Sequence, residues 1–222
     1  MSVRRPAPRR RKAPETPPHR AARVRGLAPG KRRAAAAGGD AGAAALAFLA
    51  ESRRRLRREY LPKIRRVTRG LPVRDLWWRP NAHSNSIGNL MLHLDGNVRQ
   101  WIVAGVGGVA DVRDRDAEFL AESGGDSRAL LAQLDRTLVQ ADRVLARLRP
   151  QDLLAAREIQ GYRVTVLQAV YHVVEHFSGH TGQILYAAKC RLDRDLELYT
   201  HLDGPQRRAR RRPGAARKPR FF

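Results

Sequence analysis

The sequence predicts an all-α fold, a four-helix bundle with a disordered basic tail at each end. Apolar residues recur at three- and four-residue steps in four separate segments, which is helical spacing. No segment shows the apolar–polar alternation of a β-strand over a convincing length. The 222 residues suit one domain of ordinary size. We therefore expect residues 41–204 to form the bundle, between tails at 1–40 and 205–222.

Most of the positive charge lies in the two tails. The formal net charge is +23, yet residues 1–40 hold 12 basic and 2 acidic residues, and residues 205–222 hold 8 basic residues and no acidic one. Residues 41–204 carry 24 basic and 19 acidic residues, so the predicted bundle is nearly balanced. Both tails contain few large apolar residues to offset the entropy of ordering, which predicts disorder. Arginine clusters of this kind can bind nucleic acid through its phosphates.

The first two helices are placed by their apolar spacing. The first runs from about Leu46 to Val67, and Pro62 is expected to kink or interrupt it, because proline lacks a backbone donor and crowds the preceding turn. The second is marked by seven apolar positions: Ile87, Leu90, Met91, Leu94, Val98, Trp101 and Ile102. Each helix is therefore expected to bury one face in the bundle.

The third and fourth helices have clearer ends. Asp126 or Ser127 can cap the third helix after a glycine pair, and Pro150 ends it. Its expected inner face is Leu131, Leu134, Leu138, Ala141, Leu145 and Leu148. The fourth helix spans roughly Thr165 to Leu192. Its inward face is expected to be Val166, Val170, Val173, Phe177, Ile184 and Ala188.

A stripe of histidines runs along the fourth helix. His172, His176 and His180 stand four residues apart, so they lie on one face beside the apolar stripe. The second helix carries a polar ridge that can face this stripe across the bundle: Ser86, Asn89, His93, Asn97 and Gln100. Histidines at i and i+4 are about 6 Å apart and can share a cation, whereas i and i+8 are about 12 Å apart and cannot. Either His172/His176 or His176/His180 is therefore the pair that a histidine of the facing helix completes.

A three-histidine site points to a catalytic metal. Such a site leaves one coordination position open for water or substrate, which is typical of catalytic rather than structural zinc. Imidazole nitrogens also suit nickel, iron and copper. The expected cofactor is therefore a divalent metal ion, with zinc, nickel and iron as the candidates.

Cysteine usage and hydropathy predict a cytoplasmic protein that does not engage a membrane. The single cysteine, Cys190, excludes an internal disulfide and favours a reducing compartment. No uncharged apolar run approaches the roughly 20 residues that cross a bilayer. The N-terminus also lacks the apolar segment of a signal peptide.

The same stripe contains a short peptidase-like motif. His172-Val173-Val174-Glu175-His176 matches the H-x-x-E-H pattern of inverted zinc peptidases, in which the glutamate is the general base. Such enzymes usually take a third ligand from a carboxylate well downstream. Glu197 is the only glutamate that follows, and only 46 residues remain after His176. A zinc peptidase is therefore kept as an alternative with little supporting context.

Two segments carry a resemblance to a known superfamily. The fourth helix contains His-Phe-Ser-Gly-His-Thr-Gly-Gln-Ile at 176–184, and the second contains Asn-Ser-Ile-Gly-Asn-Leu-Met-Leu-His-Leu at 85–94. Together they resemble the DinB-like (damage-inducible-like) superfamily of four-helix-bundle metalloproteins, which is related to bacterial thiol transferases. The resemblance covers about residues 45–203. It implies three metal ligands, with His172 as a nearby pocket residue: His93, His176 and His180.

The resemblance implies a metal-dependent enzyme acting on a small-molecule substrate, either a thiol-dependent transferase or a hydrolase. His172 is the catalytic candidate, because a base is needed beside the metal. The alternative from another class is a non-catalytic metal-binding protein whose basic tails contact nucleic acid. Besides the substrate, the partners that the sequence leaves open are a second copy of the chain and nucleic acid bound through the tails.

Polar residues around the histidines have two interpretations each. Three amides can fix a histidine tautomer or a water, although helix-to-loop hydrogen bonding is an equal alternative for the asparagines: Asn89, Asn97 and Gln183. Arg113 and Arg115 can clamp a substrate carboxylate. Because they alternate with Asp114 and Asp116, a charge-balanced loop is the simpler expectation.

Overall fold

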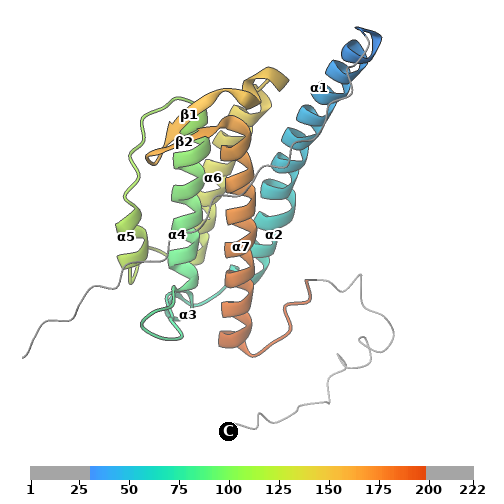
Figure 1. Ribbon diagram of the computed structural model, residues 1–222. Helices are drawn as coiled ribbons and strands as arrows, with labels where there is room; N and C mark the ends of the chain where they lie inside the picture. The colour runs from blue at the N-terminus through green and yellow to red at the C-terminus, as the bar shows by residue number, and fades with distance from the viewer. Residues whose placement is uncertain (1–30, 199–222) are drawn as a thin grey trace, which may run out of the picture.

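The computed structural model describes residues 31–198, with side chains from residue 39 onward. Four long helical segments lie side by side along most of its length (Figure 1). They are α1 (Lys31–Arg54) continuing through η1 (Arg55–Tyr60) into α2 (Leu61–Thr68), α4 (Ile87–Val98) continuing into η2 (Arg99–Val106), α6 (Ser127–Ala146) and α7 (Val166–Leu192). The shorter elements are α3 (Val73–Leu76), α5 (Arg115–Leu120), η3 (Pro150–Leu154), β1 (Ala156–Ile159) and β2 (Tyr162–Thr165). The described chain is thus mostly helical, with one small sheet.

The first helix begins earlier than expected. Helix α1 starts at Lys31, inside the range 1–40 that composition assigned to the N-terminal tail. Its first half is rich in alanine, which has the highest helix propensity of all residues, so the helix extends beyond its apolar face. The tail predictions for residues 1–30 and 205–222 fall outside the described residues.

The core lies where the four long segments meet. Its largest fully buried side chains are Phe177, Leu56, Ile64, Leu76, Ile87, Met91, Leu94, Ile102, Leu134, Leu138, Leu145 and Ile184. Every apolar position predicted for the second and fourth helices is buried. On α6, Leu130 is buried while Leu131 packs against the core partly buried. Leu46, at the expected start of the first helix, is 53% exposed. Close packing therefore sets the rotation of each histidine-bearing helix, α4 and α7, about its own axis.

Pro62 lies in the first turn of α2, directly after the π-helical turn η1. A π-helical turn directs backbone N–H groups five residues back, which shifts the hydrogen-bond register of the helix. Because proline has no N–H to donate, a register shift at this point avoids an unsatisfied carbonyl. The helix therefore continues past the expected interruption with a local distortion.

The all-α prediction is wrong in one segment, where β1 and β2 form an antiparallel hairpin that leads directly into α7. Ala156 pairs with Thr165, and Ile159 pairs with Tyr162. The two residues between the strands, Gln160 and Gly161, have positive φ angles of 54° and 77°, as a type I′ turn requires. Strands of four residues are too short for their alternation to stand out in the sequence.

Helix α7 is long enough to cross a bilayer at 27 residues, but its histidine stripe makes one face polar. Within residues 31–198, no helix combines the length and the apolar character of a membrane span.

Candidate metal centre

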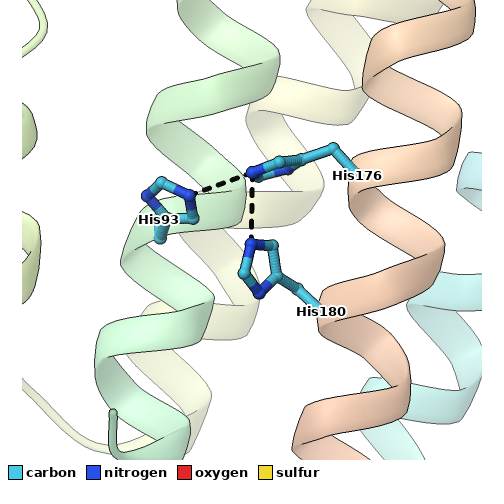
Figure 2. A group of neighbouring side chains, drawn as sticks. All are labelled: His93, His176 and His180. Atoms are coloured by element: carbon cyan, nitrogen blue, oxygen red, sulfur yellow. Dashed lines mark hydrogen bonds between the residues drawn. The ribbon is translucent and has the colours of Figure 1, made fainter. Parts of the chain in front are cut away.

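Three histidines from two helices meet between α4 and α7 (Figure 2). The Nε2 atom of His176 lies 3.0 Å from Nε2 of His93 and 3.1 Å from Nε2 of His180. One ring nitrogen from each of the three residues lies within 4.8 Å of the other two. Nitrogens bound to one tetrahedral zinc ion at about 2.05 Å are about 3.3 Å apart. The three histidines can therefore hold a single metal ion.

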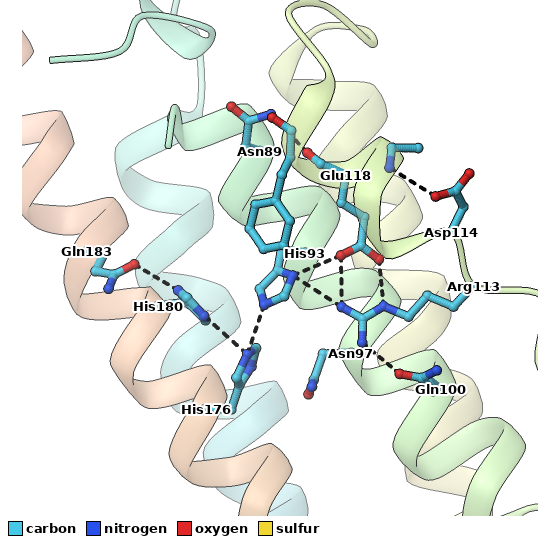
Figure 3. Close-up of polar contacts among 12 residues, drawn as sticks. Asn89, His93, Asn97, Gln100, Arg113, Asp114, Glu118, His176, His180 and Gln183 are labelled. Carbon is cyan, nitrogen blue, oxygen red and sulfur yellow. Dashed lines mark hydrogen bonds and ion pairs between the residues drawn. The ribbon is translucent and has the colours of Figure 1, made fainter. Parts of the chain in front are cut away.

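Glu118 determines the tautomer of His93. Its Oε2 atom lies 2.8 Å from Nδ1 of His93, which is buried in α4 (Figure 3). Burial alone raises the pKa of Glu118, but the hydrogen bonds and charges of Arg113 and His93 outweigh burial and lower that pKa. The carboxylate is therefore ionised and can only accept, so Nδ1 of His93 donates to it. In the neutral tautomer with the proton on Nδ1, the lone pair of His93 lies on Nε2, which faces His176. Nη2 of Arg113 lies 3.1 Å from the same Nδ1.

Arg113 holds Glu118 through two hydrogen bonds. Its Nε donates to Oε1 at 2.7 Å and its Nη2 donates to Oε2 at 2.8 Å, while Nη1 donates to Gln100 at 2.9 Å. The side chains of Arg113 and Glu118 are only 3% and 9% exposed. Arg113 therefore belongs to a buried ion pair behind His93 rather than to an exposed loop of alternating charges. Its role as a substrate clamp stays a prediction. Sequence alternation of charges did not reveal that this arginine is buried.

Gln183 determines the tautomer of His180 in the same way. Its Oε1 atom lies 2.8 Å from Nδ1 of His180, one turn further along α7. A carbonyl oxygen can only accept, so Nδ1 carries the proton and Nε2 keeps the lone pair. Gln183 is therefore placed where the sequence predicts a residue that fixes a histidine tautomer. Nε2 of His93 and Nε2 of His180 thus both face the same atom, Nε2 of His176 (Figure 2).

His176 lies between these two lone pairs. Burial and the neighbouring His180 and His93 rings lower the pKa of His176 to about 3, so its ring is neutral. A neutral ring has one N–H. If the proton is on Nε2, it can be donated to only one of the two neighbouring nitrogens at a time. Its Nδ1 atom is buried and has no hydrogen-bond partner among the described residues. Three imidazoles with converging nitrogens form a donor set that fits a divalent cation.

His172 lies outside this cluster. Its Nε2 atom is 3.3 Å from the side-chain nitrogen of Asn97, and its ring centroid is 4.1 Å from that of Trp101 and 5.5 Å from that of His176. Of the two pairings that spacing left open, the structure brings His176/His180 together with His93. Glu175, the base of the peptidase alternative, is exposed and lines a different hollow.

Glu118 is the functional residue that sequence reasoning missed. It reaches His93 because Asn89 donates to the backbone oxygens of Glu118 and Ala121, at 2.9 and 2.7 Å, and so ties α5 to α4. Of the two expectations for Asn89, the structure therefore shows the helix-to-loop hydrogen bond rather than a contact that fixes a histidine tautomer. The available signal was Gly96, an isolated glycine inside a helix, which usually has a packing reason. A Cβ atom there would lie 2.8 Å from Cδ of Glu118.

The metal-free chain is expected to lose stability as the pH falls from 7 toward 4. The pKa of His176 is about 3 in the folded chain and 6.5 in an ordinary histidine, so unfolding takes up a proton between these values and becomes easier as the pH falls. Burial also lowers the pKa of His172 and His180, which adds to the effect. Each histidine contributes at most about 1.4 kcal/mol per pH unit. Denaturant titrations in chelator at pH 7 and pH 5 measure the difference, and equal free energies of unfolding would contradict it.

Comparison with known proteins gives a family rather than an activity. No curated protein matches the chain. The model of the family described as "Protein of unknown function (DUF1572)" matches residues 43–201, which include all three clustered histidines and Glu118. With most of its length matched, the chain belongs to the DUF1572 family.

Proposed function

We propose that the chain is a metal-dependent enzyme with a DinB-like four-helix bundle, in which His93, His176 and His180 hold a divalent ion. DUF1572 is a DinB-like family, and the arrangement of the four long helical segments is consistent with such a bundle. The observation that carries the proposal is the convergence of three ring nitrogens, two of them with tautomers set from outside the cluster. Three protein ligands, rather than four, favour a catalytic site over a structural one.

A divalent ion bound there would act as a Lewis acid that lowers the pKa of a thiol or of water. Glu118 holds the ring of His93 in place, and Gln183 holds that of His180. His172 is the proposed general base, since burial lowers its pKa and keeps the ring neutral. Asn97 and Trp101 hold that ring one turn from His176.

The resemblance to thiol transferases favours thiol transfer to a small molecule. In that reaction the thiol gives its proton to Nε2 of His172, and the sulfur electron pair forms a bond to an electrophilic carbon of the substrate. The leaving group departs with the electron pair of its bond to that carbon and takes up the proton from His172. In the hydrolytic version, water replaces the thiol and gives its proton to the same nitrogen.

We expect turnover that depends on both the metal and His172. The full chain, stripped with chelator and reloaded with zinc, nickel or iron, is assayed for transfer with cysteamine and 1-chloro-2,4-dinitrobenzene, and for hydrolysis with p-nitrophenyl acetate. At least one metal should restore one activity. His172→Gln should lower the rate about 100-fold, the lower end for a lost general base, with metal content unchanged. A metal-loaded chain that is inactive in both assays contradicts the proposal, as does a His172→Gln variant with full activity.

A further inference from the structure

A cavity of about 830 Å³ opens beside the metal centre, between the loop at residues 80–85 and the C-terminal half of α7. Its volume lies within the range of small-molecule sites, about 300–1,000 Å³. Gln183, which accepts the hydrogen bond from His180, forms part of its wall. The cavity and the candidate metal centre therefore share a residue, and Figure 3 shows how Gln183 and His180 lie together on α7.

The segment just before the loop is anchored to α7 and to the end of α5. Before the loop, Asp75 binds Arg191 of α7 at 2.6 Å, and the Arg191 guanidinium lies over the ring of Trp78. Arg79 donates to the backbone oxygen of Phe119 at 2.8 Å. These contacts hold the start of the loop at a set distance from α7, so the cavity is formed before any ligand binds.

Two glycines keep the opposite wall open. Gly179 and Gly182 lie in the interior of α7, where glycine costs about 1 kcal/mol relative to alanine. A Cβ atom at either position would meet no described atom within 4 Å. Close packing therefore requires neither glycine, and the space that each leaves belongs to the cavity.

No carboxylate, ammonium or guanidinium group of the described residues lines the cavity, whose one imidazole is that of His83. The other polar groups include the carboxamides of Asn85 and Gln183 and the hydroxyls of Ser84 and Tyr186, while Leu90 supplies apolar surface. Such a lining suits a ligand with amide or hydroxyl groups and lacks the fixed cations that a phosphate or a dicarboxylate requires.

We propose that this cavity binds an uncharged small molecule bearing amide or hydroxyl groups and places it beside the metal centre. The Nε2 group of Gln183, which has no partner among the described residues, donates to the ligand while Oε1 holds His180. The placement beside a metal rests on the proposed function. Binding itself does not require the ion, so the two can be tested separately.

Cys190 provides a reporter, because it lines the cavity, is exposed and is the only cysteine in the sequence. The rate at which iodoacetamide alkylates Cys190 in the full chain is measured with two matched pairs of probes. Acetyl-Ala-Gln-amide against acetyl-Ala-Glu-amide tests an amide ligand, and trehalose against trehalose 6-phosphate tests a hydroxyl ligand. At least one neutral probe should slow alkylation threefold or more at saturation, and its charged counterpart should not.

Filling the cavity should abolish this protection. In Gly182→Leu the new side chain enters open space, so alkylation should no longer respond to the probe while metal affinity stays within twofold. Gly42→Leu is the matched control, because Gly42 lies in α1 with no described atom within 4 Å of its Cβ position, and it should keep full protection. The proposal is overturned if no probe protects, if the charged counterparts protect as well, or if Gly182→Leu remains protected. Protection that survives in His176→Ala shows that the cavity binds independently of the metal.

Discussion

Replacing His176 with alanine is expected to lower the affinity for a divalent metal roughly 100- to 1,000-fold and to leave the purified chain without bound ion. Structural zinc sites with four protein ligands bind the ion with about 10–16 kcal/mol, so one ligand accounts for about 2.5–4 kcal/mol. His176 has the central place, since its Nε2 is 3.0 Å from that of His93 and 3.1 Å from that of His180. Without it, the two remaining nitrogens are left as a two-ligand site.

Metal content by mass spectrometry and competition with a chromogenic chelator measure this loss. His172→Ala is the matched control, because it removes a half-buried histidine from the same face of α7 but outside the cluster. It should keep its metal, whereas His180→Ala should lose it. The zinc peptidase alternative predicts the reverse order for these two variants. Stoichiometric metal in His176→Ala, with a folded chain by circular dichroism, would contradict the three-histidine site.

The histidine cluster could be predicted because its geometry is mostly local. Residues four apart on a helix share a face whatever the tertiary structure, so His176 and His180 formed a pair from spacing alone. The buried apolar positions of α4 and α7 set the rotation of each helix, which turned the polar stripes toward each other. The choice of His180 over His172 needed the resemblance, since spacing treats both pairs alike.

The features that were missed depend on contacts between distant segments or on very short ones. Glu118 reaches His93 across 25 residues, and no helical or strand period relates the two positions. Arg113 lies in a segment with the composition of a surface loop. Its side chain is nevertheless buried, because α5 folds back onto α4. The hairpin was missed for another reason, because strands of four residues give too few positions for an alternating pattern. Its turn, Gln160-Gly161, has glycine at the second central position but lacks the Asn, Asp or Gly that usually occupies the first.

Gly96→Ala is expected to weaken metal binding about 10- to 100-fold without touching a ligand. The added methyl group would overlap Oε1 of Glu118 and lie 2.9 Å from Nε of Arg113. Glu118 must therefore move, and His93 loses the acceptor that fixes its tautomer. Loss of such a supporting carboxylate typically costs metal affinity by this factor. The free energy of unfolding should fall by about 1–3 kcal/mol, since a tightly packed site is overfilled.

Chelator competition and denaturant titration of Gly96→Ala test both effects, with Gly42→Ala as a helical glycine whose Cβ meets no described atom within 4 Å. The decisive comparison is a double-mutant cycle. In a Glu118→Ala background the new methyl has no carboxylate to displace and meets only the flexible side chain of Arg113, so Gly96→Ala should cost much less than in the native chain. Additive losses in the double variant would show that Gly96 acts on something other than Glu118. A coupling of about 1–3 kcal/mol would identify this glycine as the residue that admits the carboxylate behind His93.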